Sequence, residues 1–578
     1  MLKKLKSIVL QLKEKSAVEQ EPTLSKKELA AQKRKAARAR SKFLGELAGL
    51  VAVGAALAVV VFFIADPKIA LAVGAGIPVL ALSYTYPRQA IWSFFIYMPF
   101  AGTITYWIGG GNPLFQLAKD AFYIPALLAL VQQLLRRKKP LIVAKQLEVP
   151  IYILLTLSIL TVIFVNLNQQ FSSKPQGQPL LMGILGLKVF IGYIPLMTCG
   201  YYLVRNLKDL LFLTRLNVVM VIVCCSLGFV QYLMLQLGIC QGTDHLSGAD
   251  LFRATLEYKC LIGGSLVFSP SQNMIRLPGT FVAPWQWAWF LISAIFFTFA
   301  SAFSDSSLRW QGISFIGMAL VFINSVISGQ RIALALVPLF TIILLVLTGQ
   351  VTNLKRFIPI ATGLGILAIV AMVAFPSVVQ ERIDSFVDRW NASPPTAFIQ
   401  HQFEFTSKEQ RGFMGNGLGR ATNSARAFGK TTLVETYYPK ILFELGVMGV
   451  IAFLFLVSVL VFITFKKYRS LKEKHLRGYG AAFWVFVLLI SYNTYYYPLD
   501  VDPVAVYYWF IAGVVLRLPE IERQEEEKLR QAKLKVAQEE SEAKDLARIK
   551  SSQLTSKQGN SSNYNNGNGR RKVRGSRF

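Results

Sequence analysis

Hydrophobic segments of about 20 residues alternate with short polar segments along most of the chain, and each could cross roughly 30 Å of hydrocarbon as an α-helix. We therefore predict an all-α, polytopic integral membrane protein with about fourteen transmembrane helices, an even number that places both termini on the same side. The predicted spans are residues 43–65, 69–87, 89–109, 115–135, 148–166, 183–203, 209–237, 282–303, 309–328, 332–349, 355–375, 440–464, 480–496 and 501–517.

Composition and the placement of charge support this interpretation. The 578-residue chain is 53% hydrophobic and only 16% charged, whereas about a quarter of the residues in a soluble protein are charged. Its net charge of +30 is concentrated in segments that flank or join the spans, such as 26–42, 136–139 and 466–477. The positive-inside rule therefore predicts that both termini are cytoplasmic, and the same pattern favours contact with membrane lipids over nucleic-acid binding.

The predicted spans divide the chain into four regions, and the second region contains two long loops. The regions are a basic cytoplasmic tail (1–42), a transmembrane domain (43–517), a charged helical cytoplasmic segment (518–550) and a basic, Asn/Gly/Ser-rich tail that is expected to be disordered (551–578). Loops 238–281 and 376–439 fall on the extracytoplasmic side, and the second, longer one precedes the twelfth span. Long ordered loops often carry function.

The five cysteines show no metal-ligand spacing, and we expect neither a metal nor a cofactor. Cys199, Cys224 and Cys225 lie inside apolar spans and are expected to be packing residues. Cys240 and Cys260 share the first long loop, and the sequence leaves open whether they form a disulfide.

Two of the candidate functional stretches carry an arginine on the outer side. In "MIRLPGTFVAPWQWAWFLISA" (274–294), Arg276 precedes a Gly-Thr turn, although a boundary arginine beside an interfacial tryptophan belt is the alternative. In "NSVISGQRIALALVPLF" (324–340), Arg331 lies in a very short turn where positive charge is disfavoured. Its planar guanidinium would suit a diphosphate, and snorkelling to the interface is the alternative.

The third stretch, "GNGLGRATNSARAFGKTTLVETYYPKILFELGVMG", joins a glycine-rich loop to an apolar span. Its glycines would let backbone amides approach a ligand closely, and its arginines add positive charge on the outer face. The residues concerned are Gly415, Gly417, Gly419 and Arg420.

Three further charged residues lie in or near the spans. Glu435 lies just above the span, and Glu444 lies within it, where it could accept hydrogen bonds between helices in a supporting role. Lys188 is a candidate phosphate contact that could instead snorkel or pair with Asp120.

The order and spacing of "RLPGTFVAPWQWAWFL", "SGQRIALAL" and "GNGLG…ETYYPKILFELGVMGVIAFLFLV" resemble the O-antigen ligase/polymerase superfamily of bacterial membrane glycosyltransferases. The resemblance implies a multi-pass protein of the bacterial inner membrane that acts in O-antigen or exopolysaccharide biosynthesis. Its donor would be a glycan on a polyprenyl diphosphate and its acceptor a glycan or lipid, with no metal required. We favour a polymerase over a ligase, and other polysaccharide-export proteins are further candidate partners.

The resemblance also implies roles for individual residues. Arg276 and Arg331 match the arginines expected to hold the lipid diphosphate, Arg420 is a further candidate, and Glu444 matches the end of the last motif. Glu435 occupies the position where the family has a histidine. A carboxylate beside apolar surface could have a raised pKa, so we expect Glu435 to serve as the catalytic base, with Arg331 as the second catalytic residue.

Two other functions remain open at this point. A transporter of small anions such as bicarbonate would also use arginines that face a cavity, although the sequence shows no internal inverted repeat. A non-catalytic scaffold of a polysaccharide-export complex is the other alternative, with the charged C-terminal tail as its docking segment.

Overall fold

The computed structural model describes residues 26–559 apart from 65, 113–114, 116–117, 249–250, 252–255, 271–273, 352–357, 359–361, 364, 367–368, 370–372, 374–375 and 393. The protein is 77% helical. Contacts group the described residues into a main unit, 36–522, and a second unit formed by those before 36 and after 522. All the candidate site residues belong to the main unit.

The helices occupy most of the predicted spans, and 355–375 lies largely outside the described residues. The helices are α2 (Lys26–Phe62), α3 (Pro67–Thr85), α4 (Pro87–Tyr97), α6 (Asp120–Arg136), α7 (Glu148–Thr161), α8 (Leu167–Gln170), α9 (Pro179–Ile191), α10 (Leu196–Leu203), α11 (Leu207–Gln236), α12 (Pro284–Ser304), α13 (Leu308–Ile327), α14 (Arg331–Leu347), α16 (Pro376–Ala392), α17 (Pro395–Glu409), α18 (Tyr437–Arg469), α19 (Lys474–Tyr492) and α20 (Val504–Gly559). Among the described residues, nine helices are long and apolar enough to cross a membrane. The prediction of a helical membrane protein is confirmed to this extent.

Two boundaries differ from the sequence-based expectation. Helix α2 begins at Lys26, inside the predicted basic tail, and α20 continues to Gly559, inside the tail expected to be disordered. Extending an existing helix adds one hydrogen bond for each residue fixed, so polar residues can join it at little cost. Residues 560–578 lie outside the described part of the chain.

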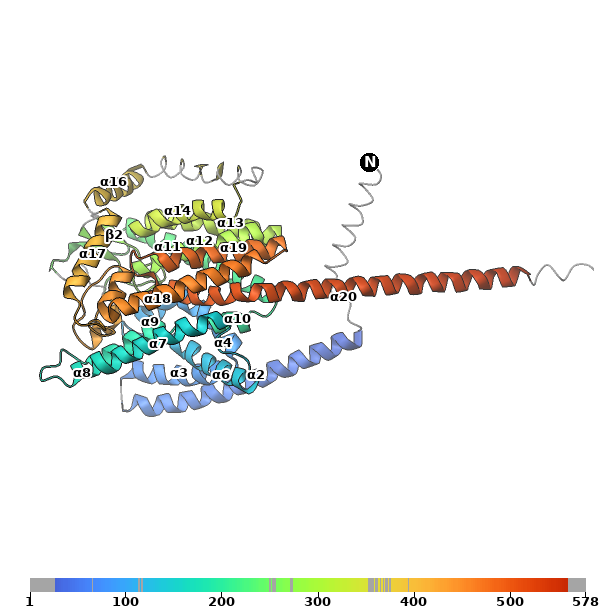
Figure 1. Ribbon diagram of the computed structural model, residues 1–578, viewed down its shortest axis with the longest axis horizontal. Coiled ribbons are helices and arrows are strands. Elements are labelled where there is room, and N and C mark those ends of the chain that lie inside the picture. The colour runs from blue at the N-terminus through green and yellow to red at the C-terminus, as the bar shows by residue number, and fades with distance from the viewer. Residues whose placement is uncertain are drawn as a thin grey trace, which may run out of the picture. The chain divides into compact units, whose positions relative to one another are not determined.

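Helix α12 is the centre of the bundle (Figure 1) and contacts α11, α13, α14 and α19. All of its residues from Trp287 to Ser304 are buried, as expected for a helix that is apolar all round. Trp287 and Trp289 are therefore core residues and not members of an interfacial belt, whereas Trp285 is exposed. The tryptophan-belt alternative is thus wrong for two of the three residues.

The outer helices present large apolar side chains on their surface, in contrast to α12. Val59, Val60 and Phe62 of α2 are all more than half exposed, which is the arrangement expected where lipid replaces water. Helices α2 and α3 approach closely, because a Cβ on Gly54 would lie 2.3 Å from the carbonyl oxygen of Gly74. Small residues at such contacts are typical of helix packing in membranes.

Sheet in the described residues is confined to one antiparallel hairpin in the first long loop. Strand β1 (Val267–Ser269) pairs with β2 (Met274–Arg276), and Val267 lies opposite Arg276. The hairpin matters because it ends on a candidate site residue.

Candidate functional site

The turns that carry the two predicted arginines lie against each other. Arg276 is the last residue of β2, and Arg331 is the first residue of α14, directly after the turn that leaves α13. The amide of Leu277 donates to the carbonyl oxygen of Ser328 at 3.0 Å. A Cβ on Gly329 would lie 3.4 Å from both Cα and Cγ of Arg276. The fold therefore brings together two stretches that are far apart in the sequence.

Arg276 is a largely desolvated cation. Its Nε is buried and has no hydrogen-bond partner among the described residues. Burial lowers the pKa of Arg276, and the opposing effects of Tyr496, Glu435 and Tyr497 do not fully offset that cost. Desolvation makes the charged form of the guanidinium unfavourable. An anion bound beside Arg276 would offset this cost through its attraction to the positive charge. We refer to Arg276, Glu435, Tyr496 and Tyr497 as the Arg276 cluster.

A second buried donor adjoins the cluster. Gln330, which follows Gly329 and precedes α14, is only 8% exposed. Its Nε2 has no hydrogen-bond partner in the described part of the chain. Buried polar groups are rarely left unsatisfied in native proteins, so two such donors on neighbouring turns indicate a place for a hydrogen-bond acceptor.

The two tyrosines of the cluster have an unusual backbone. The φ angles of Tyr496 and Tyr497 are 56° and 32°, in the left-handed region that bulky residues seldom adopt. The carbonyl oxygen of Tyr496 accepts a hydrogen bond from Nε1 of Trp289 at 3.2 Å, and the hydroxyl of Tyr497 accepts one from Nδ2 of Asn423 at 3.4 Å. Backbone strain of this kind is concentrated at functional sites.

Glu435 is fixed between α17 and the tyrosine turn. Its amide donates to Oε1 of Gln402 on α17 at 3.0 Å, and its carbonyl oxygen accepts from the amide of Tyr496 at 3.1 Å. The charge of Glu435 acts on both Arg276 and Tyr497, and burial followed by this charge raises the pKa of the Tyr497 hydroxyl. The structure thus places the predicted base next to Arg276, one of the three predicted diphosphate-binding arginines.

The glycine-rich loop docks on a break in α18. Helix α18 is interrupted at Gly446, whose φ is 70°, so the carbonyls just before the break lose their usual helical partners. The amide of Asn416 donates to the carbonyl oxygen of Phe443 at 2.8 Å, and that of Gly417 donates to the carbonyl oxygen of Glu444 at 3.2 Å. A Cβ on Gly415 would lie 2.7 Å from the amide nitrogen of Gly446, so both positions require glycine.

The loop amides are therefore used inside the protein. Leu418 donates to Oδ1 of Asn166 at 3.0 Å, and Ala421 donates to Oε1 of Glu444 at 2.7 Å. Glu444 also accepts from the hydroxyl of Thr422 at 3.1 Å. The amides of Asn416, Gly417, Leu418 and Ala421 are thus bonded within the protein, so these four do not meet the expectation that the loop amides approach a ligand. The loop and buried Glu444 instead hold α18 in place beneath Glu435.

Arg420 and Lys188 have partners outside the Arg276 cluster. Arg420 donates from Nε to Oε1 of Gln169 at 3.0 Å and from Nη1 to the carbonyl oxygen of Gln176 at 3.3 Å, and burial lowers its pKa. Arg426 is the loop arginine whose charge acts on Tyr497. Nζ of Lys188 lies 2.9 Å from the carboxylate of Asp120, which is one of the alternatives left open by the sequence.

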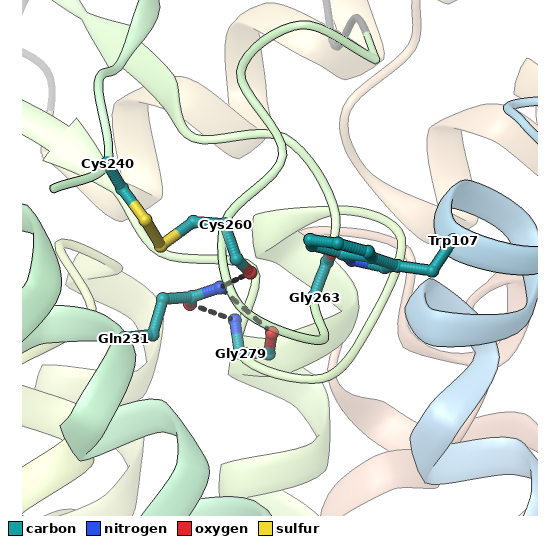
Figure 2. The surroundings of a disulfide bond; sticks show 6 residues. All are labelled: Trp107, Gln231, Cys240, Cys260, Gly263 and Gly279. Atoms are coloured by element: carbon teal, nitrogen blue, oxygen red, sulfur yellow. Dashed lines mark hydrogen bonds between the residues drawn. A yellow bond between two sulfur atoms is a disulfide. The ribbon is translucent and has the colours of Figure 1, made fainter.

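A disulfide braces the loop that supports Arg276. Cys240 and Cys260 are bonded (Figure 2). The side chain of Gln231 on α11 joins this bond to the turn after Arg276, because its Nε2 donates to the carbonyl oxygen of Cys260 at 3.1 Å and its Oε1 accepts from the amide of Gly279 at 3.0 Å. The other three cysteines are buried, as expected of packing residues.

Sequence reasoning missed Gln330, Gln402 and Asn423 as parts of the site. Gln330 could have been found as the polar neighbour of Arg331 in the "SGQR" turn. Gln402 and Asn423 carry no local signal, because only the packing of their segments against α18 and the tyrosine turn gives them a role. No protein-family model and no curated protein matches this sequence.

Proposed function

We propose that this protein is a membrane glycosyltransferase that transfers or polymerises a glycan from a polyprenyl-diphosphate carrier at the extracytoplasmic face. The observation that carries the proposal is the Arg276 cluster, where a guanidinium with a buried, unsatisfied Nε–H adjoins a second unsatisfied donor, Gln330. A diphosphate supplies several oxygens that can accept hydrogen bonds from these donors. Its negative charge would also balance the positive charge of the guanidinium.

The proposed reaction needs little beyond positioning, a base and neutralisation of charge. The acceptor hydroxyl oxygen attacks the anomeric carbon while the bond from that carbon to the diphosphate oxygen breaks. The hydroxyl proton passes to the carboxylate of Glu435, and the lipid diphosphate leaves with the bonding electron pair. Arg276 and Arg331 stabilise the negative charge that develops on the leaving group. Tyr497 remains neutral and can donate a hydrogen bond to the sugar or the diphosphate.

The proposal includes a topology. We place about fourteen spans in the bacterial inner membrane, with both termini in the cytoplasm and loops 238–281 and 376–439 outside. The apolar surface of α2 and the disulfide in the first of these loops support this arrangement, because disulfides persist in oxidising compartments. The carrier-linked donor would therefore meet the Arg276 cluster from the outer leaflet.

The test uses purified protein in lipid nanodiscs with a labelled oligosaccharide on polyprenyl diphosphate, and release of the lipid diphosphate is measured. Arg276→Met and Glu435→Gln should each slow release by about a hundredfold, because one removes charge stabilisation and the other removes the base. Gln330→Leu should slow it by a smaller factor. Arg309→Met is the matched control, since Arg309 is an exposed arginine at the start of α13, outside the cluster.

The products separate the activities. A ladder of products indicates a polymerase, and a single addition to a supplied acceptor indicates a ligase. Wild-type protein that releases no diphosphate but carries bicarbonate across the membrane would overturn the proposal in favour of an anion transporter. Equal loss of activity in Arg309→Met would show that the arginine effect is not specific to the cluster.

A further inference from the structure

Helix α16, in the second long loop, has one apolar face that is exposed. Its apolar side chains recur at intervals of three and four residues, which places them on one side of a helix. They are Val379, Ile383, Phe386, Val387 and Trp390. Ile383, Val387 and Trp390 are 50%, 47% and 53% exposed, and the rings of Phe386 and Trp390 lie 6.1 Å apart. Monomeric proteins in water seldom leave such a stripe uncovered.

Most of the remaining positions of α16 are polar. Nε2 of Gln380 donates to Oδ1 of Asp384 at 2.8 Å, one turn along the helix, and Asp388 is exposed on the same side. The sequence of α16 contains two arginines and three acidic residues, and 2 − 3 gives a net charge of −1. Electrostatic attraction to anionic lipids therefore cannot be what holds α16 at a membrane.

We infer that α16 is an interfacial helix that lies along the outer surface of the membrane, with its apolar face among the lipid chains. Three observations favour lipid as the occupant. The helix directly follows the apolar segment 355–375, which the sequence predicts to be a span, so α16 starts where the chain would leave the membrane. Trp390 is a residue type enriched at membrane interfaces. The exposed stripe also has the width and composition of helices that bind membranes by apolar burial.

An interfacial α16 would also hold the neighbouring helix in place. Pro395 is the first residue of α17 and Pro394 directly precedes it, and the ring of each proline fixes its φ. Helix α17 carries Gln402, whose side chain accepts a hydrogen bond from the amide of Glu435. Figure 1 shows α16 and α17 at the same end of the bundle as β2. Helix α16 is therefore a positioning element that anchors α17 to the bilayer beside the Arg276 cluster. The inference requires a membrane but does not require glycosyl transfer.

Site-directed spin labelling of the full-length protein in nanodiscs tests this inference. Single cysteines are introduced at Val387 on the apolar face and at Asp388 on the polar face. The native cysteines do not compete for the label, because two form the disulfide and three are buried. Collision with oxygen reports lipid, and collision with a water-soluble nickel complex reports water. Val59 on α2 and Lys408 on α17 are exposed reference positions for the two environments.

We expect a severalfold higher oxygen-to-nickel collision ratio for Val387→Cys than for Asp388→Cys. The ratio should repeat with the helical period along the other positions of the two faces. It should be the same in phosphatidylcholine and in phosphatidylglycerol nanodiscs and insensitive to salt, because apolar burial carries the binding.

Two results would overturn the inference. Equal access of the nickel complex to both faces would mean that α16 lies in water. Protection of the apolar face from both reagents would mean that protein covers it, either a second copy or another part of this chain. Neither outcome depends on enzyme activity, so failure of this inference is separable from failure of the proposed glycosyl transfer.

Discussion

The ion pair between Lys440 and Asp500 and the Arg276 cluster each hold a desolvated cation, but they satisfy it differently. Lys440 and Asp500 form a direct ion pair, and their side chains are only 3% and 8% exposed. Arg276 has the charge of Glu435 nearby, yet its Nε–H has no partner among the described residues. Removal of one partner from a buried ion pair is strongly destabilising, whereas a desolvated cation with an unsatisfied donor is suited to receive a ligand.

The largest expected effect comes from breaking the compensated pair. Asp500→Ala leaves Lys440 charged and buried without its carboxylate, so the free energy of unfolding should fall by about 3 to 5 kcal/mol. Chemical unfolding in detergent measures this change. The double variant with Lys440→Met should recover much of the loss, because it removes the uncompensated charge. A single variant as stable as wild type would contradict the contrast between the two regions.

Substitution of Arg420 tests whether the arginines of the two long loops belong with Arg276. Arg420→Met removes charged hydrogen bonds to Gln169 and Gln176, so unfolding should become easier by about 1.5 to 3 kcal/mol. Unfolding of Arg420→Met is compared with that of Arg426→Met. Among the described residues, the guanidinium of Arg426 donates only one hydrogen bond, from Nε to Oγ1 of Thr431 at 3.3 Å. If Arg420→Met left stability unchanged while abolishing diphosphate release, Arg420 would return to the site.

Substitution of Gly446 tests whether the break in α18 is required to hold this helix in place next to Glu435. In Gly446→Ala the new Cβ would lie 2.2 Å from the carbonyl oxygen of Phe413, at a φ of 70° that alanine rarely adopts. The expected cost is about 1 to 3 kcal/mol of stability. Gly76→Ala in α3 is the matched control, because a Cβ there would meet nothing within 4 Å, and it should be neutral or stabilising. Equal unfolding midpoints for the two variants would show that the break in α18 is not required.

The smallest expected change in stability is at Arg276 itself. Arg276→Met removes a desolvated charge together with an unsatisfied donor, so the free energy of unfolding should change by less than about 1 kcal/mol. Binding of inorganic pyrophosphate, measured by calorimetry, should nevertheless be lost. A large destabilisation without any loss of pyrophosphate binding would make Arg276 a structural residue like Lys440.

The sequence alone determined the helical membrane class and predicted three residues of the site, Arg276, Arg331 and Glu435. Apolar segments of spanning length leave a chain little choice but helices, because a helix satisfies its backbone hydrogen bonds internally. Arg276 and Arg331 were visible because a cation beside an apolar span is costly and therefore conspicuous. The pairing of Cys240 with Cys260 could not be decided, because spacing says nothing of the distance between two Cα atoms.

The tertiary structure decided everything that depends on contacts between distant segments. It buried Trp287 and Trp289 in the core, and it bonded the amides of Asn416 and Gly417 to carbonyl oxygens beside the break in α18. It also brought Gln402 to Glu435 and left Gln330 with an unsatisfied donor. Hydropathy reports whether a segment leaves water, but the partner of each buried polar group is set by how the helices pack.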